Sequence, residues 1–141
     1  MRSVNGIVLL AVLMTFVGWI RAESLIAQDH VRQPLIGAWE GTVTQEGTPS
    51  APTRLEFSEK DGKLLWKWSW HASFGNGEAE GIVTKYEPPS VEMSGRYTSH
   101  PFSAIENSPI TMSLTVAGTF MQGNGLTSAV NRVFSVSVTK K

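Results

Sequence analysis

Cysteine is absent from this chain of 141 residues. Without it the protein can form no disulfide, no thiolate metal site and no thiol nucleophile, and it cannot be anchored as a lipoprotein through an amino-terminal cysteine. Stability must therefore come from the packing of a core. The chain also lacks any Asn-x-Ser/Thr acceptor for N-glycosylation.

An excess of charge of one sign is lacking as well. Lys and Arg number 12, Asp and Glu number 12, and the formal net charge is +0. Proteins that bind nucleic acid or anionic membrane surfaces need clustered Lys and Arg. The sequence therefore predicts neither of these partners.

A long hydrophobic run occurs near the amino terminus, over residues 7–20, with Arg2 before it and Arg21 after it. This run of 14 residues is shorter than the roughly 20 that span a bilayer as a helix. A basic start, an apolar core and a following stretch of small residues are typical of a secretory signal peptide. We predict a signal peptide over residues 1–24, with an uncleaved membrane anchor as the alternative. The candidate cleavage positions follow Ser24, Ala22 or Ala27.

The predicted location is therefore secreted or periplasmic. A lack of both cysteine and glycosylation acceptors is more typical of bacterial than of eukaryotic exported proteins. Residues 25–34 are polar and mixed in character and end at Pro34, which predicts a linker or an extended arm. The folded domain is predicted over residues 35–141.

From Leu35 onward apolar and polar residues alternate with a period of two, which is the pattern of half-buried β-strands. Turn signals such as Asp61-Gly62, Gly75-Asn76-Gly77 and Pro88-Pro89 separate the alternating segments. Residues 99–110 fit no strand and are predicted to form a long irregular connection. The predicted strands are residues 36–45, 53–59, 63–71, 78–86, 91–98, 110–116, 118–127 and 133–139.

Most connections between these segments are short, so neighbouring strands should pair antiparallel. Strands with one apolar and one polar face can close into a barrel, and closure removes the exposed edges that favour aggregation. We predict an all-β, eight-stranded, antiparallel up-and-down barrel. A two-sheet β-sandwich is the alternative.

The first predicted strand opens with Gly37-Ala38-Trp39. A Gly-x-Trp motif at the head of a small antiparallel barrel resembles the lipocalin-like (calycin) group. In that group the Trp lies inside one end of the barrel and is covered by an Arg from the closing end of the chain. The resemblance implies that Trp39 and Arg132 form this pair, held by a cation–π interaction. It also implies a barrel with a tendency to hold small apolar ligands.

A second segment, residues 95–101, looks like a stretch of the avidin family. Biotin binding in that family depends on several Trp residues, including some in the later strands. No Trp follows Trp70 in this chain, so a biotin site is not predicted.

The ionisable residues show no pattern of a catalytic or metal site. His30, His71 and His100 are not spaced two or four residues apart, whereas zinc needs three or four convergent ligands. Glu78 and Glu80 share one face of a predicted strand, but two acids beside a glycine turn are usually a solvated edge. Nucleophile elbows, phosphate-binding loops and zinc-binding helices have no counterpart in the sequence. We therefore expect neither an enzyme nor a bound cofactor or metal.

The most informative feature is a row of three tryptophans, Trp66, Trp68 and Trp70, on one face of the third predicted strand. Large aromatic side chains can fill the core of a narrow barrel. They can also line the wall of a site for apolar ligands. Both interpretations hold if Trp66 and Trp68 pack in the core while Trp70, nearest the following turn, faces an opening.

The sequence predicts a non-catalytic exported barrel that binds a small apolar or aromatic ligand at one end. The candidate ligand contacts are Trp39, Trp70, Tyr97 and Phe102. Structural roles are assigned to Trp66, Trp68 and Arg132. The alternative is a protein-binding module, such as an inhibitor of an exported hydrolase, whose 25–34 arm or 99–110 connection enters the partner's cleft. An open apolar interior favours the ligand binder, and a filled barrel favours the inhibitor.

Overall fold

The structure is a computed structural model that describes residues 34–141. The predicted signal peptide and all but the last residue of the predicted arm, as well as His30, lie outside these residues. The described elements are β1 (Gly37–Gln45), β2 (Ala51–Lys60), β3 (Lys63–Ala72), β4 (Gly75–Glu87), β5 (Ser90–Ser99), β6 (Pro109–Ala117), β7 (Phe120–Thr127), the short 3-10 helix η1 (Ser128–Val130) and β8 (Arg132–Lys140).

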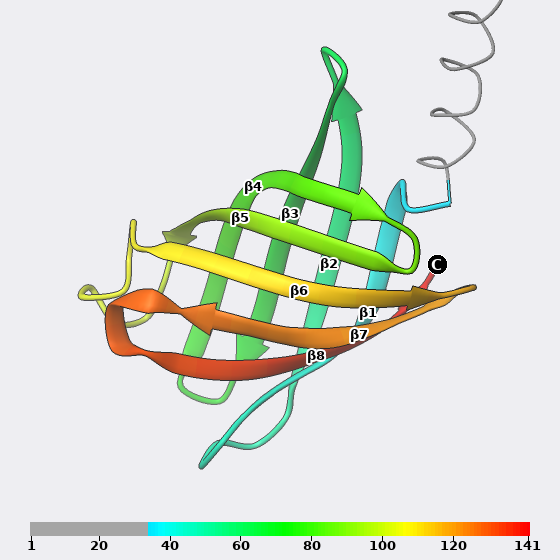
Figure 1. Ribbon diagram of the computed structural model, residues 1–141. Coiled ribbons are helices and arrows are strands. Elements are labelled where there is room, and N and C mark those ends of the chain that lie inside the picture. The colour runs from blue at the N-terminus through cyan, green and yellow to red at the C-terminus, as the bar shows by residue number, and fades with distance from the viewer. Residues whose placement is uncertain (1–33) are drawn as a thin grey trace, which may run out of the picture. The chain divides into compact units, whose positions relative to one another are not determined.

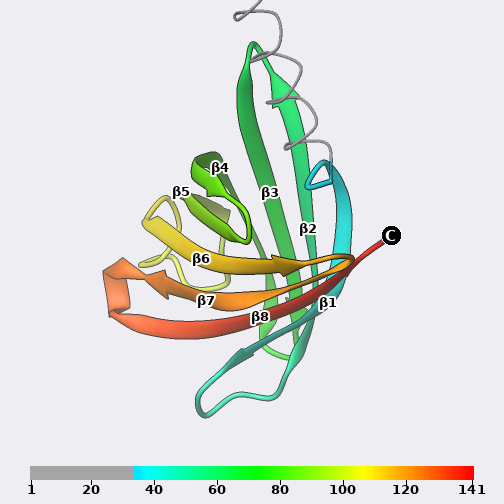
Figure 2. The same ribbon diagram turned by 45° about the vertical axis from the view of Figure 1, so that its right-hand side comes forward.

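Each strand pairs antiparallel with the next one along the chain, and β8 pairs with β1, so the sheet closes into a barrel (Figures 1 and 2). The predicted eight-stranded up-and-down barrel is therefore confirmed, and the β-sandwich is not formed. Between residues 34 and 141 no helix has the length and apolar character needed to cross a membrane.

Alternation along each strand sends every second side chain into the barrel. The inward row of β3 consists of Leu64, Trp66, Trp68 and Trp70, all of which are buried, whereas His71 is exposed on the outer face. The prediction that the three tryptophans share one face is confirmed. Their indoles form the largest aromatic part of the interior.

Glycines in adjacent strands make room for the wide aromatic rings of the interior, those of Trp70 and Phe134 among them. A Cβ atom added to Gly77 would lie 2.2 Å from Cζ2 of Trp70, and one added to Gly125 would lie 2.0 Å from Cζ of Phe134. Glycine inside a strand often marks such a close approach. Gly125, inside β7, is thus part of the packing.

The turn between β3 and β4 differs from the prediction. Gly75-Asn76-Gly77 was expected to form the turn, but Ala72 pairs directly with Gly75, so the turn consists of Ser73 and Phe74. The three residues from Gly75 to Gly77 begin β4 instead. Gly77 is needed there because its position faces the Trp70 indole.

The irregular connection after β5 is shorter than predicted, because β5 continues to Ser99 and β6 begins at Pro109. It comprises residues 100–108, which are held in place by backbone hydrogen bonds. The N–H groups of Ile105 and Glu106 donate to the Phe102 carbonyl at 3.0 and 3.3 Å, and Asn107 N–H donates to the Tyr97 carbonyl at 3.0 Å. Ile105 is buried, so the connection is docked onto the barrel.

The two ends of the barrel differ in their connections. At one end, which we call the short-turn end, two-residue turns join β2 to β3, β4 to β5 and β6 to β7. At the other end lie residues 46–50, the Ser73-Phe74 turn, residues 100–108 and η1, and we call this end the long-loop end. Loops with more residues than a turn requires commonly carry function.

Trp39 is fully buried near the short-turn end, and Lys140 Nζ lies 5.7 Å from the centroid of its ring. The prediction that Arg132 covers Trp39 is wrong. Because β8 runs antiparallel to β1, Trp39 faces Lys140, whereas Phe134, two residues after Arg132, faces Gln45. Arg132 therefore belongs to the opposite, long-loop end.

The corrected pairing can be tested with double-mutant cycles. We expect a coupling free energy of about 0.5–1 kcal/mol between Lys140→Met and Trp39→Leu, since both changes remove the same cation–π contact. Arg132→Met and Trp39→Leu should be additive, because their sites lie at opposite ends of the barrel. Urea unfolding of both sets of variants measures the two couplings. Coupling of Arg132 with Trp39, and none of Lys140, would contradict the assignment.

Candidate ligand-binding site

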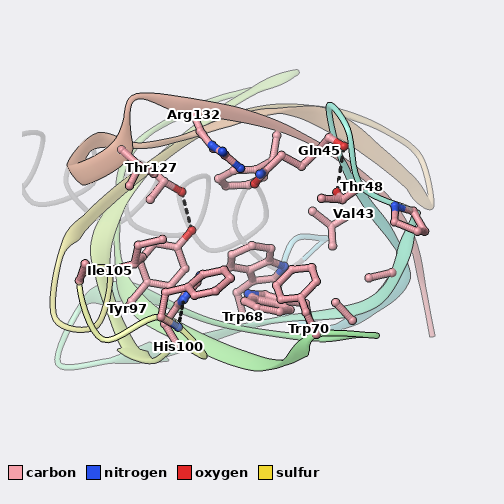
Figure 3. Close-up of a pocket in the computed structure, with 18 residues that line it drawn as sticks. Val43, Gln45, Thr48, Trp68, Trp70, Tyr97, His100, Ile105, Thr127 and Arg132 are labelled. Carbon is pink, nitrogen blue, oxygen red and sulfur yellow. Dashed lines mark hydrogen bonds between the residues drawn. The ribbon is translucent and has the colours of Figure 1, made fainter.

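The barrel contains a cavity of about 520 Å³ at its long-loop end, shown in Figure 3 with the 18 residues that line it. Side chains from strands and loops on all sides of the barrel reach it. They are Val43, Gln45, Thr48 and Pro49 of β1 and its loop, Ala51 of β2, Trp68, Trp70, Ala72 and Phe74 of β3 and its turn, Tyr97, His100, Phe102, Ala104 and Ile105 of β5 and its loop, and Thr127, Val130, Arg132 and Phe134 of β7, η1 and β8.

The inner part of the cavity is aromatic. The Trp68 ring is stacked on Phe134, with centroids 5.1 Å apart and planes inclined by 10°. Trp70 and Tyr97 lie on either side of Trp68 at centroid distances of 6.4 and 6.3 Å. These rings present flat apolar surfaces, which suit a flat apolar ligand.

Two buried threonines fix the orientation of this aromatic group. Trp68 Nε1–H donates to Oγ1 of Thr53, whose hydroxyl in turn donates to the Ser69 carbonyl at 2.7 Å. The Tyr97 hydroxyl and the Thr127 hydroxyl are hydrogen-bonded at 2.7 Å. Because the polar atoms of both rings are paired within the protein, their apolar faces are held ready for a ligand without an unsatisfied buried group.

His100 lies where the aromatic group reaches the mouth. Its ring centroid is 5.4 Å from that of Trp70, 5.1 Å from that of Tyr97 and 5.6 Å from that of Phe102. The Phe102 backbone N–H donates to Nδ1 of His100 at 3.0 Å, which fixes the ring against its own loop. His100 therefore connects the 100–108 loop to the aromatic wall.

Burial shifts the pKa values of two ionisable rings in the cavity toward their neutral forms. It lowers the pKa of the His100 imidazole, although the Glu106 carboxylate acts in the opposite direction. Burial also raises the pKa of the Tyr97 phenol, against the effect of its hydrogen bond with Thr127. Both shifts favour the neutral form near neutral pH.

The rim exposes apolar surface. Phe74 is 47% exposed and Phe102 is 55% exposed, and their rings are stacked with centroids 5.8 Å apart. The two residues come from different connections, the β3–β4 turn and the 100–108 loop. Their contact forms an aromatic edge that a ligand entering the cavity must pass or touch.

Three of the four predicted ligand contacts, Trp70, Tyr97 and Phe102, line this cavity. Trp39 does not, because it is buried near the short-turn end. Trp68 was assigned a structural role, but it is both a packed residue and part of the cavity wall.

His100 and Phe134 were missed at the sequence level. Phe134 could have been found from its inward position near the start of the last strand. The inclusion of His100 depends on how its loop folds back onto the barrel.

The other ionisable candidates lie elsewhere. Glu78 and Glu80 are exposed on the outer face of β4. Within residues 34–141 no three His, Asp or Glu residues come together in a group that could hold a metal ion.

No protein-family model and no curated protein matches the sequence. Among solved structures, the chain is similar to two redesigned β-barrels. One has 20% sequence identity and a TM-score of 0.64, with 79% of this chain and 95% of the other covered. The second is mFAP1 bound to DFHBI, with 18% identity, a TM-score of 0.64, and 79% and 98% of the two chains covered. At this level of identity the likeness shows a shared fold, the closed antiparallel β-barrel.

Proposed function

We propose that this protein is a non-catalytic, exported barrel that binds a small, flat, apolar or aromatic ligand in the cavity at the long-loop end. The observation that carries the proposal is the open interior. A cavity of about 520 Å³ lies in the range of roughly 300–1,000 Å³ that is typical of small-molecule sites. A barrel filled by its own side chains would have favoured the protein-binding alternative.

Two further observations support this proposal. The wall is built from aromatic rings whose polar atoms are already hydrogen-bonded, which pre-organises the site and lowers the entropic cost of binding. A barrel of similar fold, mFAP1, has been solved with DFHBI bound, so this architecture can accommodate a ligand.

The lipocalin-like relationship and the export of the protein belong to the same proposal. Gly37-Ala38-Trp39 heads β1, Trp39 is buried, and a cation from the end of the chain lies over its ring. Only the identity of this cation, Lys140, differs from the expected Arg132. Export rests on the sequence of residues 1–24, and amino-terminal sequencing of protein recovered outside the cytoplasm tests it.

Titration with N-phenyl-1-naphthylamine, a neutral dye that becomes fluorescent when it leaves water, tests ligand binding. We expect saturable binding to the wild-type protein. Val43→Trp places a large ring in the cavity, because Val43 lines it, and should weaken binding at least about tenfold, the factor that corresponds to 1.4 kcal/mol.

Thr44→Trp is the matched control, since the next residue along β1 points to the outer face and is exposed. It should leave the dissociation constant within about a factor of two of wild type, as expected for a distant surface change. Near-ultraviolet circular dichroism verifies that both variants are folded. Equal binding by the two variants would place the dye outside the cavity and contradict the proposal.

The exposed, stacked Phe74 and Phe102 favour a second candidate, a protein-binding module such as an inhibitor of an exported hydrolase. Aromatic residues on a rim can act as anchors in a partner's pocket. In this case Phe102→Ala should weaken inhibition of the hydrolase, whereas Val43→Trp should not. Inhibition assays with the two variants separate this candidate from the first.

A further inference from the structure

One residue supplies the permanent charge of the cavity. Its lining contains no Asp, Glu or Lys, and its ionisable side chains are Tyr97, His100 and Arg132. The phenol and the imidazole are held in their neutral forms, as described above. The Arg132 guanidinium stays protonated at all accessible pH values, so the lining has a single positive charge.

This charge is not neutralised by the protein. Among residues 34–141 the basic side chains that form ion pairs are those of Arg54, Lys85 and Lys141. Arg132 forms neither an ion pair nor a hydrogen bond with the described part of the chain. Its five N–H donors are therefore available to a ligand.

Arg132 is also placed to face the cavity. Phe134, Val136 and Val138 point into the barrel and are buried, so Arg132 occupies the inward position of β8 nearest the mouth. In Figure 3 it lies on the wall opposite Trp70 and His100.

The same wall has a second free donor. Gln45, which pairs with Phe134 across the β1–β8 ladder, lies beside Arg132 on this wall (Figure 3). Its side-chain amide makes no hydrogen bond within residues 34–141. The cavity thus has an aromatic wall that faces a wall of hydrogen-bond donors.

We infer that the ligand of this cavity is an apolar monocarboxylate, whose ring system lies against Trp68, Trp70 and Phe134 and whose carboxylate is bound by Arg132 at the mouth. This inference rests on the proposed function and names the class of ligand. A guanidinium can hold a carboxylate through two parallel N–H···O bonds. The Gln45 amide can donate a further bond to the same group.

The single charge decides between ligand classes. A ligand with two carboxylates would find a cationic partner in the lining for only one of them, so its second charge would gain no ion pair. A cationic ligand would be repelled by Arg132. A neutral ligand could use the aromatic wall but would gain nothing from the guanidinium.

The test is a competition against N-phenyl-1-naphthylamine by 2-naphthoate and 2-naphthamide, which share a ring system and differ in charge. For the wild-type protein at low ionic strength, naphthoate should displace the dye at a concentration about three- to tenfold lower than naphthamide. High salt should reduce this preference, because the contact lies at a solvent-accessible mouth.

Arg132→Gln should abolish the preference for naphthoate. The preference is measured as the ratio of the two displacing concentrations within one variant, so a change in dye affinity caused by altering this lining residue cancels. Lys67→Gln is the matched control: it removes the same charge from the outer face of β3 and should retain the preference. Arg132→Lys keeps the positive charge but loses the planar guanidinium that can donate two parallel hydrogen bonds, so it should retain part of the preference for naphthoate.

Two outcomes would overturn the inference, and they are distinguishable. If the dye binds but the two competitors displace it equally, or if the preference survives Arg132→Gln, the monocarboxylate assignment is wrong and the proposed function stands. If the dye does not enter the cavity of the wild-type protein at all, the proposed function fails, and the inference fails with it.

Discussion

Trp66→Ala is expected to lower the free energy of unfolding by about 3–5 kcal/mol, the range for removal of a large buried aromatic side chain. Trp66 is 1% exposed, and its Nε1–H donates to the Ile82 carbonyl at 2.9 Å. Truncation removes this buried apolar surface and leaves the carbonyl without its donor. Both effects act in the same direction.

The space left by the Trp66 indole would be difficult to fill. A Cβ at Gly95 would lie 2.6 Å from Cζ2 of Trp66, and Gly95 pairs with Gly81, which in turn pairs with Trp66. Neither glycine has a side chain that could move into the cavity. The loss of stability caused by a large-to-small change grows with the volume of the cavity that remains. We therefore expect the loss for Trp66→Ala to lie in the upper half of the range of about 3–5 kcal/mol.

Chemical denaturation of Trp66→Ala and of Ile82→Ala measures this effect against a matched control. Ile82 lies on the adjacent strand, but it is 47% exposed, so its truncation should change stability by no more than about 0.5 kcal/mol. A similar small loss for both variants would mean that the interior is not packed around the Trp66 indole.

The strands themselves could be predicted because a period of two is a local property of the sequence. Leu64, Trp66, Trp68 and Trp70 define the inward face of β3 without reference to any other strand. The short turns then imply antiparallel neighbours, and eight such strands close into a barrel. Most strand ends extend one to three residues beyond the prediction, because the ladder continues into turn-forming residues, as at Gly75. By contrast, β1 and β7 begin one and two residues later than predicted.

The predicted contact between Trp39 and Arg132 is excluded by the barrel topology that the sequence itself predicts. In an antiparallel barrel with an even number of strands, the first and last strands run in opposite directions. A residue at the start of β8 must then lie at the end of β1, away from Trp39. The sequence resemblance suggested the right chemistry, a cation over Trp39, but only the register of β1 with β8 identifies Lys140.

The cavity could not be predicted from the sequence. Whether the interior is filled depends on which side chains meet across the barrel, and that is a property of all eight registers together. Gly77 was expected in a turn and Gly125 inside a strand, and both allow the rings of Trp70 and Phe134 to approach the backbone closely. The open space at the long-loop end remains because small residues such as Ala51, Ala72 and Val43 face it.

Replacement of residues 99–106 with an Asn-Gly turn is expected to abolish binding of N-phenyl-1-naphthylamine while the barrel remains folded. The change removes His100, Phe102, Ala104 and Ile105 from the cavity lining. It also removes the ring contacts of His100 with Trp70 and Tyr97. The aromatic wall would then open to solvent on one side, and a flat ligand would lose its contacts with these four side chains.

The cost in stability should be much smaller than that of Trp66→Ala. Ile105, at 8% exposure, is the buried apolar residue of this segment, and the loss of its burial corresponds to about 1.5–3 kcal/mol at most. Closing a shorter loop costs less conformational entropy on folding, and this gain offsets part of the loss. Dye titration and thermal unfolding of the shortened protein measure the two effects separately. If the shortened protein unfolds outright, the loop is part of the core, and if it binds the dye as wild type does, the ligand site does not lie at the long-loop end.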